Sequence, residues 1–157
     1  MGYIPDDAKW YLAGIVNGII VEGDPRIVVH TNLVLVRADS PDEAYEKSMR
    51  FGKECETTFQ NPADKRVDIV FRGLHSLKVI YDQLEDGAEL DFHETVGMNV
   101  EDLRKWIIPK EKLSVFMPVR TSRGPDYASA DVIREVSERF HVHRPTRSDP
   151  KEPDNES

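Results

Sequence analysis

Three polar side chains stand among β-branched residues in the first third of the chain, where they could line a small-molecule pocket. Asn17 lies in the run WYLAGIVNGIIV, and His30 and Asn32 lie in the run RIVVHTNLVLVRA. Amide and imidazole groups supply hydrogen-bond donors and acceptors, and a few such groups inside an apolar rim are typical of a ligand site. A pocket floored by these three residues is therefore one of the interpretations that the sequence leaves open.

The other reactive side chains have no evident catalytic companions. Glu94 shares one predicted strand face with Leu90, Phe92 and Val96, so it is a candidate acid or base, although a position at a sheet edge would let it reach solvent. The single cysteine, Cys55, excludes an internal disulfide and a multi-cysteine zinc site. We find no catalytic triad and no glycine-rich phosphate loop. The sequence thus predicts no metal site and no cofactor, and it favours a non-enzymatic role.

Composition limits the class of protein. The chain has 157 residues, 39% of them hydrophobic, which suits one domain with a core of its own. A formal net charge of -8 repels phosphate backbones, so we expect no nucleic-acid partner. No run of about 18 apolar residues is present, and we expect no membrane association. These features predict an acidic cytoplasmic protein.

The candidate pocket depends on a predicted β-hairpin. Residues 9–21 and 26–38 read as two long strands, and the segment EGDP at 22–25 has turn chemistry. If those four residues form the loop, Asn17 faces His30 and Ile15 faces Asn32 across the hairpin.

This register divides the hairpin into two faces that are both apolar. The first face holds Trp10, Leu12, Val16, Ile20, Ile27, Val29, Leu33 and Leu35, and we expect the following helix to cover it. The second face surrounds the three polar residues with Tyr11, Ile15, Ile19, Val28, Val34 and Val36. An exposed sheet face normally carries charges. The second face is therefore predicted to be an oligomer interface, or to be covered by the C-terminal helix or a ligand.

A helix from Pro41 to about Cys55 has the clearest local signature. Ser40 is a predicted N-cap, Pro41 occupies the first helical position, and Glu43 is placed to return a capping bond to Ser40.

The rest of the chain predicts an α+β domain with a mainly antiparallel sheet and its helices on one side. After a loop at 59–64, three shorter strands are expected at 65–72, 77–81 and 89–96. Asn99 should cap a short helix through Trp106, and 110–116 should be helical or irregular. The predicted organisation is a loose leader (1–8), the α+β domain (9–118), a linker with an amphipathic helix (119–140) and a disordered tail (141–157).

Two passages resemble a known family. The opening WYLA at 10–13 and the passage NLVLVRADSPDEAYEK at 32–47 are similar to small bacterial proteins classed as a domain of unknown function, with Ser48 where the family pattern has alanine. The segments FRGL at 71–74, VIY at 79–81 and LEDGAEL at 84–90 fit the same pattern. The resemblance spans about residues 10–116 and implies the fold boundaries, but it implies no activity, cofactor or catalytic residue.

The sequence therefore favours a non-enzymatic interaction protein that forms homo-oligomers and possesses an acidic surface for a further protein partner. A ligand-binding or enzymatic domain that uses Asn17, His30, Asn32 and Glu94 is the alternative. Neutralisation of a basic protein is a third interpretation, and it rests on charge and size alone.

Overall fold

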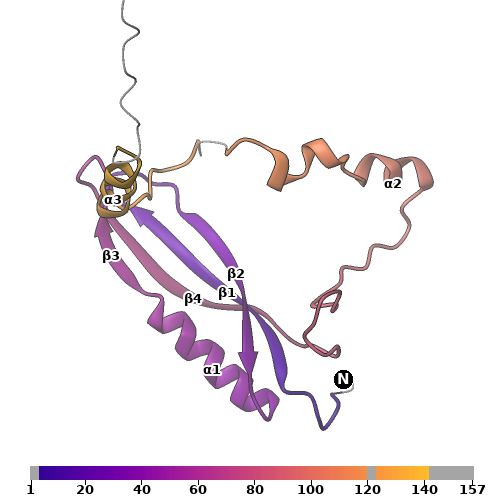
Figure 1. The fold of residues 1–157 in the computed structure, drawn as a ribbon. Helices are drawn as coiled ribbons and strands as arrows, with labels where there is room; N and C mark the ends of the chain where they lie inside the picture. The colour runs from indigo at the N-terminus through magenta and orange to yellow at the C-terminus, as the bar shows by residue number, and fades with distance from the viewer. Residues whose placement is uncertain (1–3, 120–122, 142–157) are drawn as a thin grey trace, which may run out of the picture.

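The computed structural model describes residues 4–119 and 123–141 and shows an α+β fold with one curved antiparallel sheet (Figure 1). The strand order is β2-β1-β4-β3. The strands are β1 (Trp10–Val21), β2 (Val28–Arg37), β3 (Thr57–Gln60) and β4 (Arg66–Val79). The helices are α1 (Pro41–Glu54), α2 (Val100–Trp106) and α3 (Ala130–His141), with single 3₁₀ turns η1 (Lys110–Lys112) and η2 (Ser114–Phe116). The predicted fold class is confirmed.

The predicted register of the hairpin is also confirmed. Asn17 lies opposite His30, and Ile15 lies opposite Asn32. β1 is an inner strand, paired with β2 on one side and with β4 on the other. Nearly every residue of β1 is accordingly buried, whereas most of β2, at the sheet edge, is exposed.

α1 begins where its capping signature predicts. The Ser40 hydroxyl accepts a hydrogen bond from the Glu43 backbone N–H at 3.1 Å. The return bond differs from the prediction, because the Glu43 carboxylate accepts from the backbone N–H of Asp39 at 2.8 Å rather than from Ser40. Both bonds satisfy backbone donors that the first helical turn or its approach would otherwise leave unpaired.

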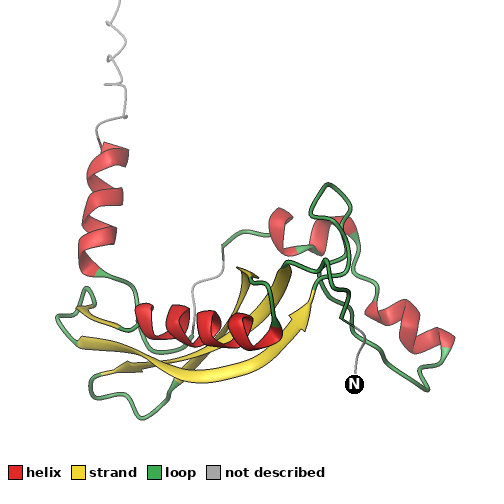
Figure 2. Cartoon of the chain, turned by 90° about the horizontal axis from the view of Figure 1, so that it is seen from below, coloured by secondary structure: helices red, strands yellow, loops and turns green. Residues whose placement is uncertain are grey.

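The prediction of which sheet face α1 covers is wrong. α1 lies along the second face, seen from below in Figure 2, and packs there in a core cluster with Tyr11, Ile15, Val36 and Phe71. Small side chains on the inner side of the helix, at Ala44, Ser48 and Gly52, allow this close approach. We call this side of the sheet the covered face. Ile19, Val28 and Val34, also predicted for an oligomer interface, pack on the same side within the chain.

β4 replaces two of the predicted short strands. The sequence places a break at Gly73, but the ladder with β1 continues through two β-bulges, where Arg72 and His75 are the extra residues. Gly73 adopts φ +137°, a conformation that side-chain-bearing residues rarely adopt. Because each bulge bends the strand, the long β4 follows the curve of the sheet.

Two further predictions fail at the ends of the sheet. β3, at Thr57–Gln60, occupies part of a segment predicted as loop, and its threonines and Phe59 are good strand formers. The predicted strand at 89–96 is irregular in the structure, although its residues alternate. Alternation gives a strand only where another strand offers its edge for hydrogen bonding.

The predicted C-terminal helix is present as α3, which follows a connection through Tyr127. The predicted disordered tail, apart from His141 at the end of α3, lies outside the described residues. The predicted leader is described from Ile4 onwards and includes one turn, in which the Ala8 N–H donates to the Pro5 carbonyl.

Candidate functional site

The three polar residues of the hairpin share one strand face but have different surroundings. Asn17 is buried, with 4% of its surface exposed, and its Oδ1 has no hydrogen-bond partner in the described part of the chain. The His30 ring packs edge-on against Tyr127, with ring centroids 5.3 Å apart. Asn32 is exposed. An aromatic side chain from the C-terminal connection thus lies over the part of the face that the ligand hypothesis requires to be open.

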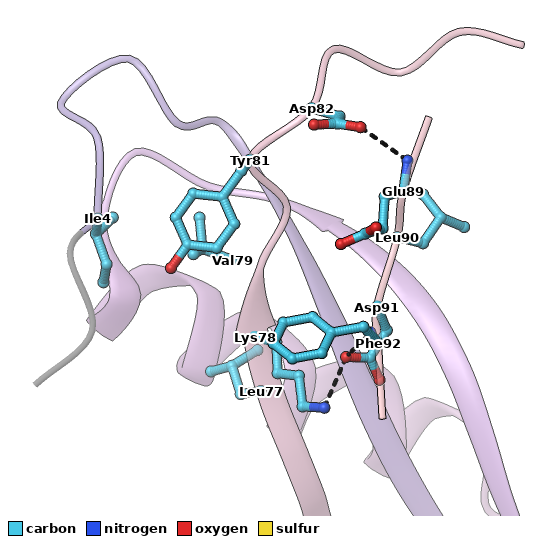
Figure 3. A pocket seen from close by; sticks show the side chains of 10 residues that line it. All are labelled: Ile4, Leu77, Lys78, Val79, Tyr81, Asp82, Glu89, Leu90, Asp91 and Phe92. Atoms are coloured by element: carbon cyan, nitrogen blue, oxygen red, sulfur yellow. Dashed lines mark hydrogen bonds and ion pairs between the residues drawn. The ribbon is translucent and has the colours of Figure 1, made fainter. Parts of the chain in front are cut away.

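A groove of about 410 Å³ lies elsewhere, between the end of β4 and the segment that follows it (Figure 3). Its walls combine apolar side chains, including Leu77 and Leu90, with charged groups that are already paired. Lys78 Nζ lies 2.7 Å from Asp91 Oδ1, and the hydrogen bond from Lys78 holds the pKa of the Asp91 carboxyl below its usual range. Asp82 accepts from the Glu89 backbone N–H at 2.9 Å. These contacts attach the segment at 89–91 to the sheet.

Glu94 lies in solvent. Its side chain is exposed, and so are Leu90, Phe92 and Val96, with which it was predicted to share a strand face. Cys55 is exposed as well. Among the described residues, no group of three or more His, Cys, Asp and Glu side chains could hold a metal ion.

The sheet side opposite α1 has exposed aliphatic side chains along its β2 edge, whereas β4 contributes Asp68, Arg72, Ser76 and Lys78 to the same side. Val29 and Leu33 on β2 are 61% and 64% exposed, and Ile27 and Leu35 flank them. We call this side of the sheet the open face; on β1 it includes Trp10, Val16 and Ile20, which are partly exposed, and Leu12, which is buried. Scattered apolar side chains are normal on protein surfaces, but a contiguous patch of this kind marks an interaction site.

Two glycines flatten the middle of the open face. A Cβ on Gly14 would lie 2.6 Å from Ser76 Oγ, and a Cβ on Gly18 would lie 3.0 Å from Arg72 Nε. Side chains of β4 therefore lie low across β1. The Ser76 and Arg72 side chains thus occupy the space above β1, and the exposed aliphatic side chains of β2 form a border beside them.

A second apolar surface lies in the segment that leaves the sheet after β4. We call residues 92–119 the arm; it contains α2, η1 and η2 and extends away from the sheet (Figure 1). Every residue from 92 to 116 is exposed. The exposed apolar side chains of the arm are Phe92, Val96, Met98, Val100, Leu103, Trp106, Ile107, Ile108, Leu113, Val115, Phe116 and Val119.

The sequence predicted that residues up to 118 belong to the α+β domain, and it did not identify the arm as a surface. A signal is present in retrospect, because 12 large apolar residues occur in a segment whose helical pieces are too short to build a core. Only the structure reveals that these residues have no cover in the described chain.

The family model described as "Domain of unknown function (DUF4288)" matches residues 10–91, which contain the whole sheet and α1. The match ends at the residue before the arm. We found no significant match among curated proteins and none among solved structures. None of the described helices combines the length and apolar character that crossing a bilayer requires.

Proposed function

We propose that this chain, which belongs to the DUF4288 family of domains of unknown function, is a non-enzymatic interaction protein that self-associates through its open face. The residues first predicted for the interface, Tyr11, Ile15, Ile19 and Val36, are buried in the core of the single chain. The proposal therefore moves the interface to the opposite side of the sheet.

The exposed aliphatic border on β2 carries this proposal. Val29, Leu33 and Leu35 alternate along an edge strand and are all exposed, together with Ile27 just before it. Edge strands of monomeric proteins usually carry charges or prolines that discourage pairing. On the open face of β2, Thr31 and Arg37 are the only polar side chains. A buried area of about 800 Å² on each partner suffices for a stable dimer.

Charge opposes contact between two copies, so the attraction between them has to come from apolar burial. Each copy has a formal net charge of -8, so two copies repel one another at long range. Burial of the aliphatic border has to overcome this repulsion, and added salt, which screens charge, should strengthen the association.

The single cysteine, which is exposed and unpaired, and the acidic composition support a cytoplasmic location within the same proposal.

Sedimentation equilibrium tests self-association. At micromolar concentration we expect a mass of at least twice 18.0 kDa. Leu33→Asp should return the mass to that of one chain, because it places a charge in the contact. Asn32→Asp is the matched control: it adds the same charge at the next residue, on the other side of β2, and should leave the mass unchanged. A single-chain mass for the unmodified protein at high concentration would rule the proposal out.

A ligand site remains the second candidate because of one observation. The buried Asn17 Oδ1 has no partner in the described residues, and an unpaired buried acceptor costs about 1–3 kcal/mol. A ligand or water that donates a hydrogen bond there would remove this cost. Asn17→Leu separates the two cases: it should raise the melting temperature if the acceptor is unpaired and lower it if a bound donor is lost.

A further inference from the structure

We propose that the open face of one copy is covered by the arm of a second copy, so that two chains exchange arms. This inference rests on the self-association proposed above and names the surface that meets the sheet. It assigns the interface to two different parts of the chain, rather than to two open faces that pack against each other.

α2 is too short to be stable without packing. The helix comprises seven residues, and all of them are exposed. Isolated helices shorter than about 12–15 residues are marginal in water, because few hydrogen bonds repay the ordering of the backbone. α2 has a cap, since Asn99 Oδ1 accepts from the Asp102 backbone N–H at 2.9 Å, but one cap does not replace packing. A helix this short is stabilised when an apolar surface receives it.

α2 has an apolar stripe along one side. Val100, Leu103 and Ile107 follow the i, i+3, i+7 spacing of one helix face, and Trp106 borders them. Charged residues, including Glu101 and Lys105, occupy the other side. This pattern is typical of a helix that lays one face on a flat apolar surface. The aliphatic part of the open face, at Val29, Leu33 and Leu35 of β2, offers such a surface.

The chain contacts the sheet just before the arm and again after it. At the start of the arm, Asp91 bonds to Lys78 at one end of the sheet. After the arm, Asn61 Nδ2 donates to the Asp126 carbonyl at 2.9 Å, and Tyr127 packs on His30. Contacts before and after the arm thus hold the described chain to the sheet, and the arm projects from the sheet between them. This arrangement holds its apolar residues away from the chain and available to another molecule.

A second copy is the occupant that matches both surfaces. Each chain has one open face and one arm. In a two-fold dimer each arm would cover the open face of the other chain, and no open face or arm would stay uncovered. The arm has a length of the order that one side of a standard interface requires, about 20–30 residues. An unrelated partner that covered the arm would leave the open face exposed.

Cysteine cross-linking tests whether two chains exchange arms. The two cysteine variants differ in molecular mass, so a product that contains one chain of each can be recognised by its size. Both variants carry Cys55→Ser; one has Leu33→Cys on the open face, and the other has Leu103→Cys on α2. Both positions are exposed, so neither change disturbs the core. The two proteins are mixed, equilibrated and treated with a short bis-maleimide. We expect a product of mixed size as the main species. The control pairs Leu103→Cys with Glu46→Cys, on the outer side of α1, and should give little product.

The other outcomes separate this inference from the proposed function. Linkage of Leu33→Cys to itself, without the mixed product, would mean that two sheets meet directly; self-association would stand and arm exchange would be overturned. A third variant that carries both Leu33→Cys and Leu103→Cys tests whether the arm folds back on its own sheet. Linkage within this chain, without the mixed product, would also overturn the exchange. A single-chain mass in sedimentation would overturn both proposals.

A pair of arm variants measures the energetic part of the contact. Leu103→Ser should weaken dimerisation about tenfold or more, because it removes one buried aliphatic side chain from each arm. Lys105→Ser, two residues away on the charged side of α2, should change the dissociation constant less than twofold. Equal dissociation constants for the two variants would contradict the assignment of α2 to the interface.

Discussion

The covered face of the sheet and the arm contain similar apolar residues, yet the covered face buries them against α1 and the arm exposes them. In the sheet, residues at every second position of β1 meet partners on β2, β4 and α1, and a core forms around Ile15 and Val36. In the arm, Leu103 and Trp106 have comparable apolar character and remain exposed. The difference shows that apolar content alone does not make a core.

Backbone hydrogen bonding explains this difference. Each strand of the sheet fixes the next one at a set distance, so the side chains of neighbouring strands pack without a further loss of backbone entropy. The arm has one short helix and two single turns, which give its apolar side chains no neighbouring element to pack on. The arm therefore depends on contact with another surface for its order. This difference between the sheet and the arm leads to the predictions below, in which the largest effect comes first.

Phe71→Ala should destabilise the chain by about 3–5 kcal/mol, because Phe71 is 7% exposed and its ring packs between β1 and α1. Phe116→Ala, in the arm, should change the free energy of unfolding by less than about 0.5 kcal/mol. Urea denaturation at a protein concentration where the chain is monomeric measures both. Similar losses for the two variants would mean that the arm is part of the cooperative core.

Gly52→Ala should destabilise by about 1–3 kcal/mol, because an added Cβ would overlap the Phe71 ring and the ring has to move. Helix propensity alone predicts the opposite sign, since alanine is favoured over glycine by about 1 kcal/mol in a helix interior. Lys53→Ala, at the next and exposed position of α1, is the control and should be nearly neutral. Thermal unfolding of both variants decides which effect dominates.

The two capped helices give a direct comparison of the regions. Ser40→Ala should cost about 1 kcal/mol, because α1 unfolds together with the core. Asn99→Ala removes an equivalent cap from α2, yet it should leave the urea midpoint of the monomer unchanged, because α2 has no part in that transition. If Asn99→Ala shifts the midpoint as much as Ser40→Ala does, α2 belongs to the core.

The smallest effect concerns the hairpin turn. The hydrogen bond from the Arg26 side chain lowers the pKa of the Asp24 carboxyl from 3.8 to about 2. Because the folded-state pKa is depressed, this contact stabilises the fold above pH about 4 and is lost as the pH falls through 2. Carbon NMR of the Asp24 carboxyl should detect a midpoint near 2, and Arg26→Gln should return it towards 3.8. A midpoint near 3.8 in the unmodified protein would contradict the contact.

Local chemistry explains the parts that could be predicted. The four-residue turn EGDP predicted that Asn17 lies opposite His30, because the length of a hairpin loop sets the register of the two strands. Ser40 and Pro41 located the start of α1, because capping involves only neighbouring residues. For the candidate site, the sequence identified both apolar faces of the hairpin.

Tertiary structure decided which face α1 covers, and with it the location of the exposed surface. The alternating pattern assigns Tyr11 to one face and Leu12 to the other, but both faces are apolar, so the pattern cannot rank them. Gly52, beside the other small residues Ala44 and Ser48, settles the packing in three dimensions, because it admits the Phe71 ring from β4. The arm follows the same logic: its residues determine its apolar character, and the absence of a neighbouring strand among the described residues determines that it is exposed.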